Sequence, residues 1–118
     1  MARNAIPDPL ERRHLIERQL DSARALAIAE AYVGEGRSVE AVAFLRKANA
    51  ESRLDALWQE AVREGDPFLL REIAQALGRE PDVASWRQLA DVAAAAGKDR
   101  YAAEARRQVE RLANRQGG

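Results

Sequence analysis

The chain has 118 residues, of which 47% are apolar and only 5% are aromatic, while alanine alone supplies 25. At this length a single domain can bury about two-thirds of its unfolded surface without disulfides or metals. Nineteen basic residues balance nineteen acidic ones, so no net field draws the molecule to nucleic acid or to a membrane surface. Because alanine is the best helix former and lets helices pack closely, the composition predicts an all-α domain.

Cysteine is absent, which excludes disulfides and thiolate chemistry. The N-terminal residues contain no apolar run of signal-peptide length, and no segment approaches the length of a membrane span. We therefore expect a cytoplasmic protein that does not bind membranes. Seventeen of the nineteen basic residues are arginine, and this excess, together with the alanine content, is typical of a GC-rich bacterial genome.

The first predicted element is a short helix over residues 8–21. Asp8 can cap its N-terminus, and Pro9 suits the first helical position because proline has no N–H to leave unpaired. Asp21 and Ser22 can start another helix, so we expect a break there.

Residues 22–50 form the first predicted hairpin, with helices over 22–34 and 39–49. Gly34 and Gly36 end the first helix, because glycine accepts the left-handed conformation at a helix end. Ser38 is expected to cap the second helix. The predicted buried residues are Ala25, Leu26, Ile28, Ala29, Tyr32, Val33, Ala41, Val42, Leu45 and Ala48.

The second predicted hairpin covers residues 51–80. Ser52 is expected to cap its first helix, and Gly65-Asp66-Pro67 combines a helix stop, a cap and a first-turn proline. A second helix over 67–77 then ends at Gly78. The predicted buried residues are Leu54, Leu57, Trp58, Ala61, Val62, Leu70, Ile73 and Leu77.

The third predicted hairpin covers residues 81–115, with helices over 83–96 and 99–114. Pro81-Asp82 starts it, and Gly97 makes its turn. We expect its last helix to close the stack by burying one face and exposing the other. The predicted buried residues are Trp86, Leu89, Ala90, Ala93, Tyr101, Ala102, Ala105, Val109 and Leu112.

Two of the hairpins share a pattern of small residues around a turn glycine. Ala29-x2-Tyr32-x3-Gly36-x4-Ala41-x6-Ala48 recurs as Ala90-x2-Ala93-x3-Gly97-x4-Ala102-x6-Val109. The pattern resembles the tetratricopeptide repeat, with W-x2-L-G-x2-Y in one helix and A-x3-F in the next. The middle hairpin departs from it, because Trp58 falls at a small position and Leu70 replaces the alanine of the second helix.

The resemblance implies a short right-handed solenoid of six or seven helices that forms a single domain over residues 1–118. In that family, outward residues of the first helices line a concave groove for peptides. The corresponding residues here are Leu26, Glu30, Val33, Asp55, Gln59, Arg63, Arg87, Gln88 and Asp91. The acidic residues at Glu30, Asp55 and Asp91 argue against a clamp for a peptide's terminal carboxylate, and a solvated helix face without a ligand is an equally good interpretation.

The other candidate sites have ordinary structural explanations. Trp58 and Trp86 share apolar stripes with leucines, which favours core packing over a binding hot spot. His14 has no second histidine or ligand set beside it, so we expect no metal site. The sequence contains no nucleotide-binding or nucleophile motif, so we predict neither catalysis nor a cofactor.

The last predicted helix carries a basic face of four arginines. Such a face could contact phosphates or an acidic partner, but Glu104 and Glu110 lie at helical spacing from it and could pair with its members. Basic residues are also favoured near helix C-termini, so a solvated face is the simpler interpretation. The four arginines are Arg100, Arg107, Arg111 and Arg115.

Three function classes follow, in decreasing order of support. The first is a non-catalytic protein-interaction module, an adaptor or accessory subunit whose protein or peptide partner the sequence does not identify. The second is a structural protein that assembles with copies of itself, because three hairpins are near the minimum length of a solenoid. The third is nucleic-acid binding through the basic last helix, which the neutral overall charge disfavours.

Overall fold

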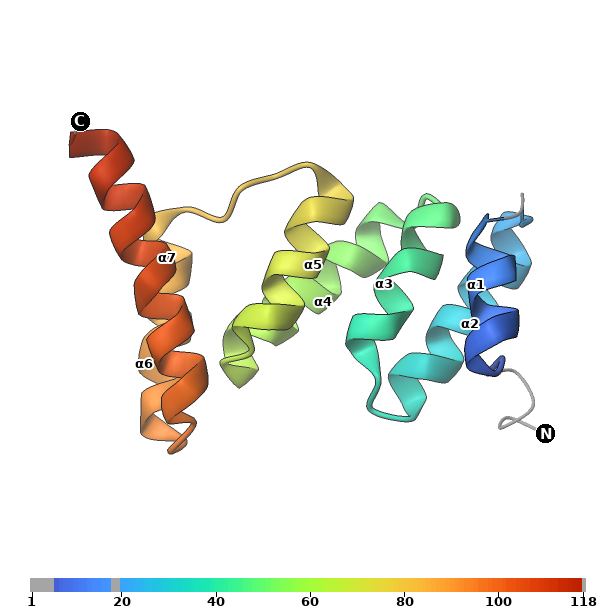
Figure 1. Ribbon diagram of the computed structural model, residues 1–118, viewed down its shortest axis with the longest axis horizontal. Helices are drawn as coiled ribbons and strands as arrows, with labels where there is room; N and C mark the ends of the chain where they lie inside the picture. Colours follow the sequence, from blue (N-terminus) through green and yellow to red (C-terminus); the bar gives the residue numbers. More distant parts are fainter. Residues whose placement is uncertain (1–5, 18–19, 118) are drawn as a thin grey trace. The chain divides into compact units, whose positions relative to one another are not determined.

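A computed structural model describes residues 6–17 and 20–117, and every regular element in these ranges is an α-helix (Figure 1). This confirms the predicted all-α class. Of the predicted first helix, residues 18–19 lie outside the described residues. The seven helices in the described ranges are α1 (Pro9–Glu17), α2 (Ser22–Gly34), α3 (Ser38–Lys47), α4 (Glu51–Glu64), α5 (Pro67–Leu77), α6 (Val83–Ala95) and α7 (Asp99–Gly117).

The chain divides into two compact units, Met1–Asp55 and Ala56–Gly118, and the boundary falls within α4. In the first unit, α2 packs along α3 and α1 packs on α3. The Asp21 side chain accepts a hydrogen bond from the backbone N–H of Arg24 at 2.8 Å, so the predicted new helix start is confirmed. The buried core of this unit consists of Leu15, Ala25, Ile28, Ala29, Tyr32, Ala41, Val42, Phe44, Leu45 and Leu54.

The predicted serine caps of α3 and α4 are wrong. Ser38 is the first residue of α3, and the N-cap residue Arg37 makes no side-chain capping bond. Ser52 lies inside α4, which begins at Glu51. A serine cap requires the helix to begin at the residue after the serine, but α3 begins one residue earlier than that and α4 begins two residues earlier.

The buried stripe of α2 is narrower than predicted. Ala25, Ile28, Ala29 and Tyr32 are buried at the i, i+3, i+4, i+7 spacing of one helix face. Leu26 lies beside this stripe and is 39% exposed, and Val33 is half-buried. Both residues were expected in the core as well as in the groove, and their position at the stripe's edge explains the difference. The unpredicted Phe44 fills this core instead and stacks on Tyr32, with ring centroids 5.7 Å apart.

In the second unit, α6 and α7 run side by side (Figure 1). Helix α5 packs on α7. Asp66 and Asp82 cap α5 and α6 by accepting bonds from the backbone N–H groups of Leu69 at 3.1 Å and Ser85 at 2.8 Å. The sequence predicted the cap at Asp66 and a hairpin start at Pro81-Asp82. The buried apolar residues are Leu57, Ala61, Val62, Leu69, Leu70, Ile73, Ala74, Trp86, Leu89, Ala90, Ala93, Ala102, Ala105 and Leu112.

The turn after α4 is packed against the end of α6. Gly65 has a φ of +72°, and a Cβ added to it would lie 2.9 Å from the backbone N and Cα of Ala93. The Nζ of Lys98 donates to the carbonyl of Glu64 at 2.9 Å across the same contact. A glycine is therefore required at this turn both for its left-handed backbone and for the close approach.

Helix α7 has the two faces expected of it. Ala102, Ala105 and Leu112 are buried, and Tyr101 and Val109 are half-buried. The outer residues Arg106, Arg107, Glu110, Arg111 and Asn114 are exposed. Trp86 is a core residue as predicted, whereas Trp58 is only half-buried. Within the described ranges, no helix has the length and apolar character needed to cross a membrane.

Candidate binding cleft

The residues predicted to line a groove lie on the surfaces of α2, α4 and α6. Eight of the nine are exposed and Val33 is half-buried. Glu30 accepts two hydrogen bonds from the guanidinium of Arg53, at 2.7 and 3.0 Å, so its charge is engaged within the first unit. Arg87, Gln88 and Asp91 stand on α6 of the second unit. The groove itself stays a prediction.

The predicted basic face lies on α7, and all four of its arginines are exposed. Arg107 pairs with Glu104, as the helical spacing predicted. Arg111 pairs with Glu80 outside the helix and not with Glu110. In the part of the chain that the structure describes, Arg100 and Arg115 have no ion pair.

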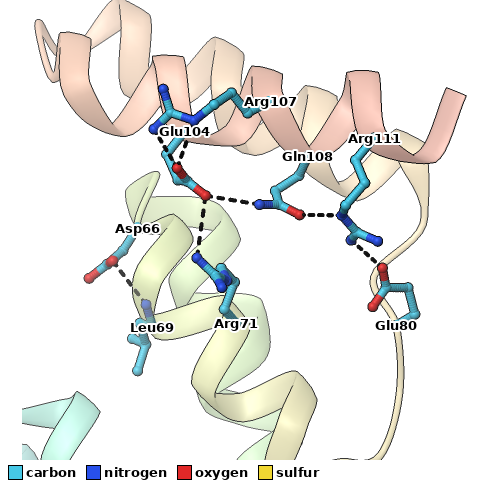
Figure 2. Close-up of polar contacts among 8 residues, drawn as sticks. All are labelled: Asp66, Leu69, Arg71, Glu80, Glu104, Arg107, Gln108 and Arg111. Carbon is cyan, nitrogen blue, oxygen red and sulfur yellow. Dashed lines mark hydrogen bonds and ion pairs between the residues drawn. The ribbon is translucent and has the colours of Figure 1, made fainter. Parts of the chain in front are cut away.

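An open cleft of about 500 Å³ in the second unit collects arginines from three elements. Helix α5 forms one wall, the irregular linker over residues 79–82 forms another, and α7 forms the third (Figure 2). We call it the arginine cleft. Its lining residues are Arg71, Ala74, Gln75, Gly78, Arg79, Glu80, Pro81, Trp86, Gln108 and Arg111.

A nearly buried carboxylate organises one side of the arginine cleft. The side chain of Glu104 is 10% exposed and accepts hydrogen bonds from three residues (Figure 2). The donors are Nε of Arg107 at 3.0 Å, Nε2 of Gln108 at 2.9 Å and Nη1 of Arg71 at 3.4 Å. Two arginines thus share this one carboxylate, and α5 is tied to α7 through it.

These contacts keep Glu104 ionised. Burial raises the pKa of its carboxyl, but the hydrogen bonds from Arg107 and Gln108 and the charges of Arg107 and Arg71 lower it by more. The net pKa therefore lies below the ordinary value of 4.5. Glu104 is a charged acceptor at neutral pH and serves to position its three donors.

The hydrogen-bond network continues from Glu104 to the linker. Oε1 of Gln108 accepts from Nε of Arg111 at 2.9 Å, and Nη2 of Arg111 pairs with the carboxylate of Glu80 (Figure 2). The side chains of Arg111 and Glu80 are 42% and 51% exposed. The Arg111 guanidinium is therefore held by an amide on one side and faces an exposed carboxylate on the other.

Both tryptophans of the chain lie at this part of the second unit. The guanidinium of Arg79 lies over the ring of Trp58, 5.1 Å from its centroid. Trp86 lines the cleft, is 1% exposed and has no acceptor for its indole Nε1 among the described residues. A buried donor without an acceptor is unusual in folded proteins.

The arrangement is suited to binding anionic oxygen atoms. Three arginines, Arg71, Arg107 and Arg111, pair with two carboxylates, those of Glu80 and Glu104. Guanidinium groups bind carboxylates in planar, two-pronged pairs that are stronger than neutral hydrogen bonds. The arginine cleft therefore holds an excess of positive charge that an anionic ligand could balance.

Sequence reasoning found only the α7 part of this site. Arg107 and Arg111 were singled out by their helical spacing, but Arg71, Arg79 and Glu80 were not. One signal was available: Gly78, with a φ of +65°, ends α5 next to Arg79 and Glu80, so the chain had to leave the helix with two charged residues at its turn.

Comparisons with known proteins do not assign this site. No protein-family model, no curated protein and no solved structure matches the chain. What the arginine cleft can bind therefore follows from its own contacts, charges and shape.

Proposed function

We propose that this protein is a non-catalytic interaction module, an adaptor or accessory subunit that holds a segment of a partner protein. The observation that carries the proposal is the arginine cleft, an open volume of about 500 Å³ with guanidinium and amide donors on its walls. Protein interfaces obtain much of their binding energy from a few well-placed arginine and aromatic side chains. The cleft offers arginines of this kind on a framework of packed helices.

The resemblance to tetratricopeptide repeats supports the same function. The hairpins α2–α3 and α6–α7 share their pattern of small residues, and each turns at a glycine with a positive φ, +74° at Gly36 and +76° at Gly97. We propose that the hairpins belong to a short right-handed solenoid, an architecture whose usual role is to hold other proteins. The predicted groove on α2, α4 and α6 is the alternative binding surface.

A second candidate function is self-assembly, and an exposed aromatic pair favours it. Phe68 is 43% exposed and meets Tyr101 edge-to-face, with ring centroids 5.5 Å apart. Aromatic residues at a surface are enriched in protein interfaces. A second copy of the chain could cover this pair without using the arginine cleft.

Affinity capture with a matched variant tests the proposed function. Wild-type protein and the double variant R79Q/R111Q are immobilised and exposed to lysate of the native host, and retained proteins are identified by mass spectrometry. We expect at least one lysate protein that the wild-type column retains and the variant column does not. After purification, this protein should again bind the wild type. Identical sets on both columns would contradict the role of the cleft.

Light scattering coupled to size exclusion tests self-assembly separately. A stable oligomer that Phe68→Ser dissociates would establish the second candidate function. A monomer at the concentrations used for capture would support the interaction module.

A further inference from the structure

Glu80 occupies the position in the arginine cleft that a ligand carboxylate would need. We propose that the cleft binds an acidic peptide segment, and that a side-chain carboxylate of this segment displaces Glu80 from Arg111. The inference rests on the proposed function and names the chemical class of its partner. It makes Glu80 a built-in competitor whose removal strengthens binding.

The charge balance of the cleft supports an acidic ligand. Arg71 and Arg107 share the single carboxylate of Glu104, and the Arg71 contact is long at 3.4 Å. The side chain of Arg71 is 49% exposed, so its remaining donors can reach a ligand. With Arg111 released from Glu80, two guanidinium groups on facing walls of the cleft would be available to carboxylates.

The pair between Arg111 and Glu80 is weak enough to exchange. Both side chains are about half exposed, and ion pairs between exposed side chains contribute little to stability. The linker backbone does not have to move, because the N–H of Arg79 is bonded to the carbonyl of Ala74 at 3.0 Å and Pro81 is buried. Only the Glu80 side chain must rotate away.

Arg111 itself is positioned for its new partner before the partner arrives. Nε2 of Gln108 donates to the carboxylate of Glu104 at 2.9 Å, and Oε1 of Gln108 accepts from Nε of Arg111 at 2.9 Å (Figure 2). This leaves the terminal nitrogens of the guanidinium for a carboxylate. Because Glu104 is nearly buried and accepts from three residues, it is not displaced and acts as a positioning residue.

The observations favour an acidic peptide over a nucleic acid. Glu80 is itself a carboxylate carried by a peptide chain, and it fits Arg111. Nucleic-acid binding requires an extended basic track that neutralises several phosphates. Here the net charge of the chain is zero, and among the described residues the lining of the cleft includes three arginines and no further basic residue.

The test measures binding of a fluorescein-labelled peptide of alternating glutamate and serine by fluorescence anisotropy, with a glutamine–serine peptide as its neutral control. We expect Glu80→Gln to tighten binding of the acidic peptide about two- to five-fold, because an exposed competing pair is lost. Glu110→Gln removes the same charge from an exposed site outside the cleft and should leave affinity within about two-fold.

The arginine variants should act in the opposite direction. Arg111→Gln should weaken binding about ten-fold, whereas Arg106→Gln, at an exposed site on the same helix outside the cleft, should change it less than about two-fold. Arg71→Gln on α5 provides a second variant on another helix. Circular dichroism melting confirms that each variant is folded before binding is measured.

Two results would overturn the inference. The first is that Glu80→Gln lowers the affinity for the acidic peptide or leaves it unchanged. The second is that the protein binds a deoxythymidine oligonucleotide more tightly than the acidic peptide. If the R79Q/R111Q variant loses a captured partner but the acidic peptide does not bind the wild type, the interaction module stands and the acidic class of ligand is wrong. If no captured partner depends on the cleft and the acidic peptide still binds with the expected variant effects, the acidic class of ligand stands and the interaction module is wrong.

Discussion

The two units each contain an open cleft with three arginines, and they use them differently. The first-unit cleft measures about 550 Å³ and the arginine cleft about 500 Å³. The arginines are Arg12, Arg13 and Arg37 in the first unit and Arg71, Arg79 and Arg111 in the second. A count of basic residues would rank these two clefts equally.

In the first unit Arg12 and Arg37 are committed to the fold. The guanidinium of Arg12 lies over the rings of Tyr32 and Phe44, 5.8 and 5.6 Å from their centroids, and donates to the carbonyl of Glu40 at 3.1 Å. Arg37 gives two hydrogen bonds of 2.7 Å to the Glu40 carboxylate and lies 5.0 Å from the Tyr32 ring centroid. These contacts join Arg12 and Arg37 to the aromatic rings and to Glu40, which gives both arginines a structural role.

In the second unit the arginines share carboxylates. The nearly buried Glu104 accepts from both Arg71 and Arg107, and the exposed Glu80 pairs with Arg111. The comparison shows that an arginine's capacity to bind a ligand depends on which of its donors the fold has already used.

Deleting residues 99–118 should abolish the cooperative melting of the second unit. Helix α7 packs on α5 and α6, and its loss would expose the buried face of Trp86 and Leu89 and remove Glu104. Exposed apolar surface of this kind leads to aggregation. Far-UV circular dichroism and light scattering measure both effects. A truncated protein that stays monomeric and melts as before would show that α7 is an independent arm.

The turn glycines should differ between the units. Gly65→Ala combines a strained φ with a backbone clash at Ala93 and should lower the free energy of unfolding by about 3 kcal/mol. Gly36→Ala has a similar φ of +74° but open space around its Cβ, so strain alone should cost about 1 kcal/mol. Urea denaturation compares them, and equal losses would mean that the Gly65 turn is not packed as described.

Ala41→Leu should destabilise the first unit by roughly 1–3 kcal/mol through overpacking, because Ala41 is fully buried on α3 where α2 packs on it. Ala27→Leu adds the same volume at an exposed position of α2 and should change stability by less than about 0.5 kcal/mol. Chemical denaturation provides the test. An unchanged midpoint for Ala41→Leu would mean that the two helices do not approach closely there.

Glu104→Gln should lower the free energy of unfolding by about 1–2 kcal/mol at neutral pH, because charge-assisted bonds from two arginines become neutral ones. The pKa of Glu104 is lowered in the folded state, so its stabilisation is complete above the ordinary pKa of 4.5 and disappears as the pH falls through the folded value. Wild type and variant should therefore converge in acid. A difference that persists at low pH would assign the effect to packing.

Much of the fold was predictable from local chemistry. Asp21, Asp66 and Asp82 each precede a helix and each caps it, because an aspartate before a helix-forming stretch can bond to the N–H groups that the helix leaves unpaired. The turn at Gly65 was predictable because Gly65-Asp66-Pro67 combines a helix stop, a cap and a first-turn proline. The serine caps failed because serine is also tolerated inside the first helical turn, so its presence alone does not fix the start.

The arginine cleft was not predictable in the same way. Arg71 and Glu104 lie 33 residues apart in the sequence, and Glu80 and Arg111 lie 31 apart. Helical periodicity reports which residues share a face of one helix, but not which faces of different helices meet. The pairing of Glu104 with Arg107 was predicted, but its burial was not, because acidic residues normally lie at the surface and the second partner, Arg71, is on another helix.

The most direct test of the contrast between the clefts is a nitrogen–proton NMR titration with the acidic peptide. We predict that the indole N–H of Trp86, the side-chain Nε–H of Arg111 and the backbone of residues 71–80 shift together with one affinity. The signals of Arg12, Tyr32 and Arg37 should stay in place. Shifts concentrated at these first-unit residues, or along the predicted groove at Leu26, Glu30 and Arg87, would contradict the account.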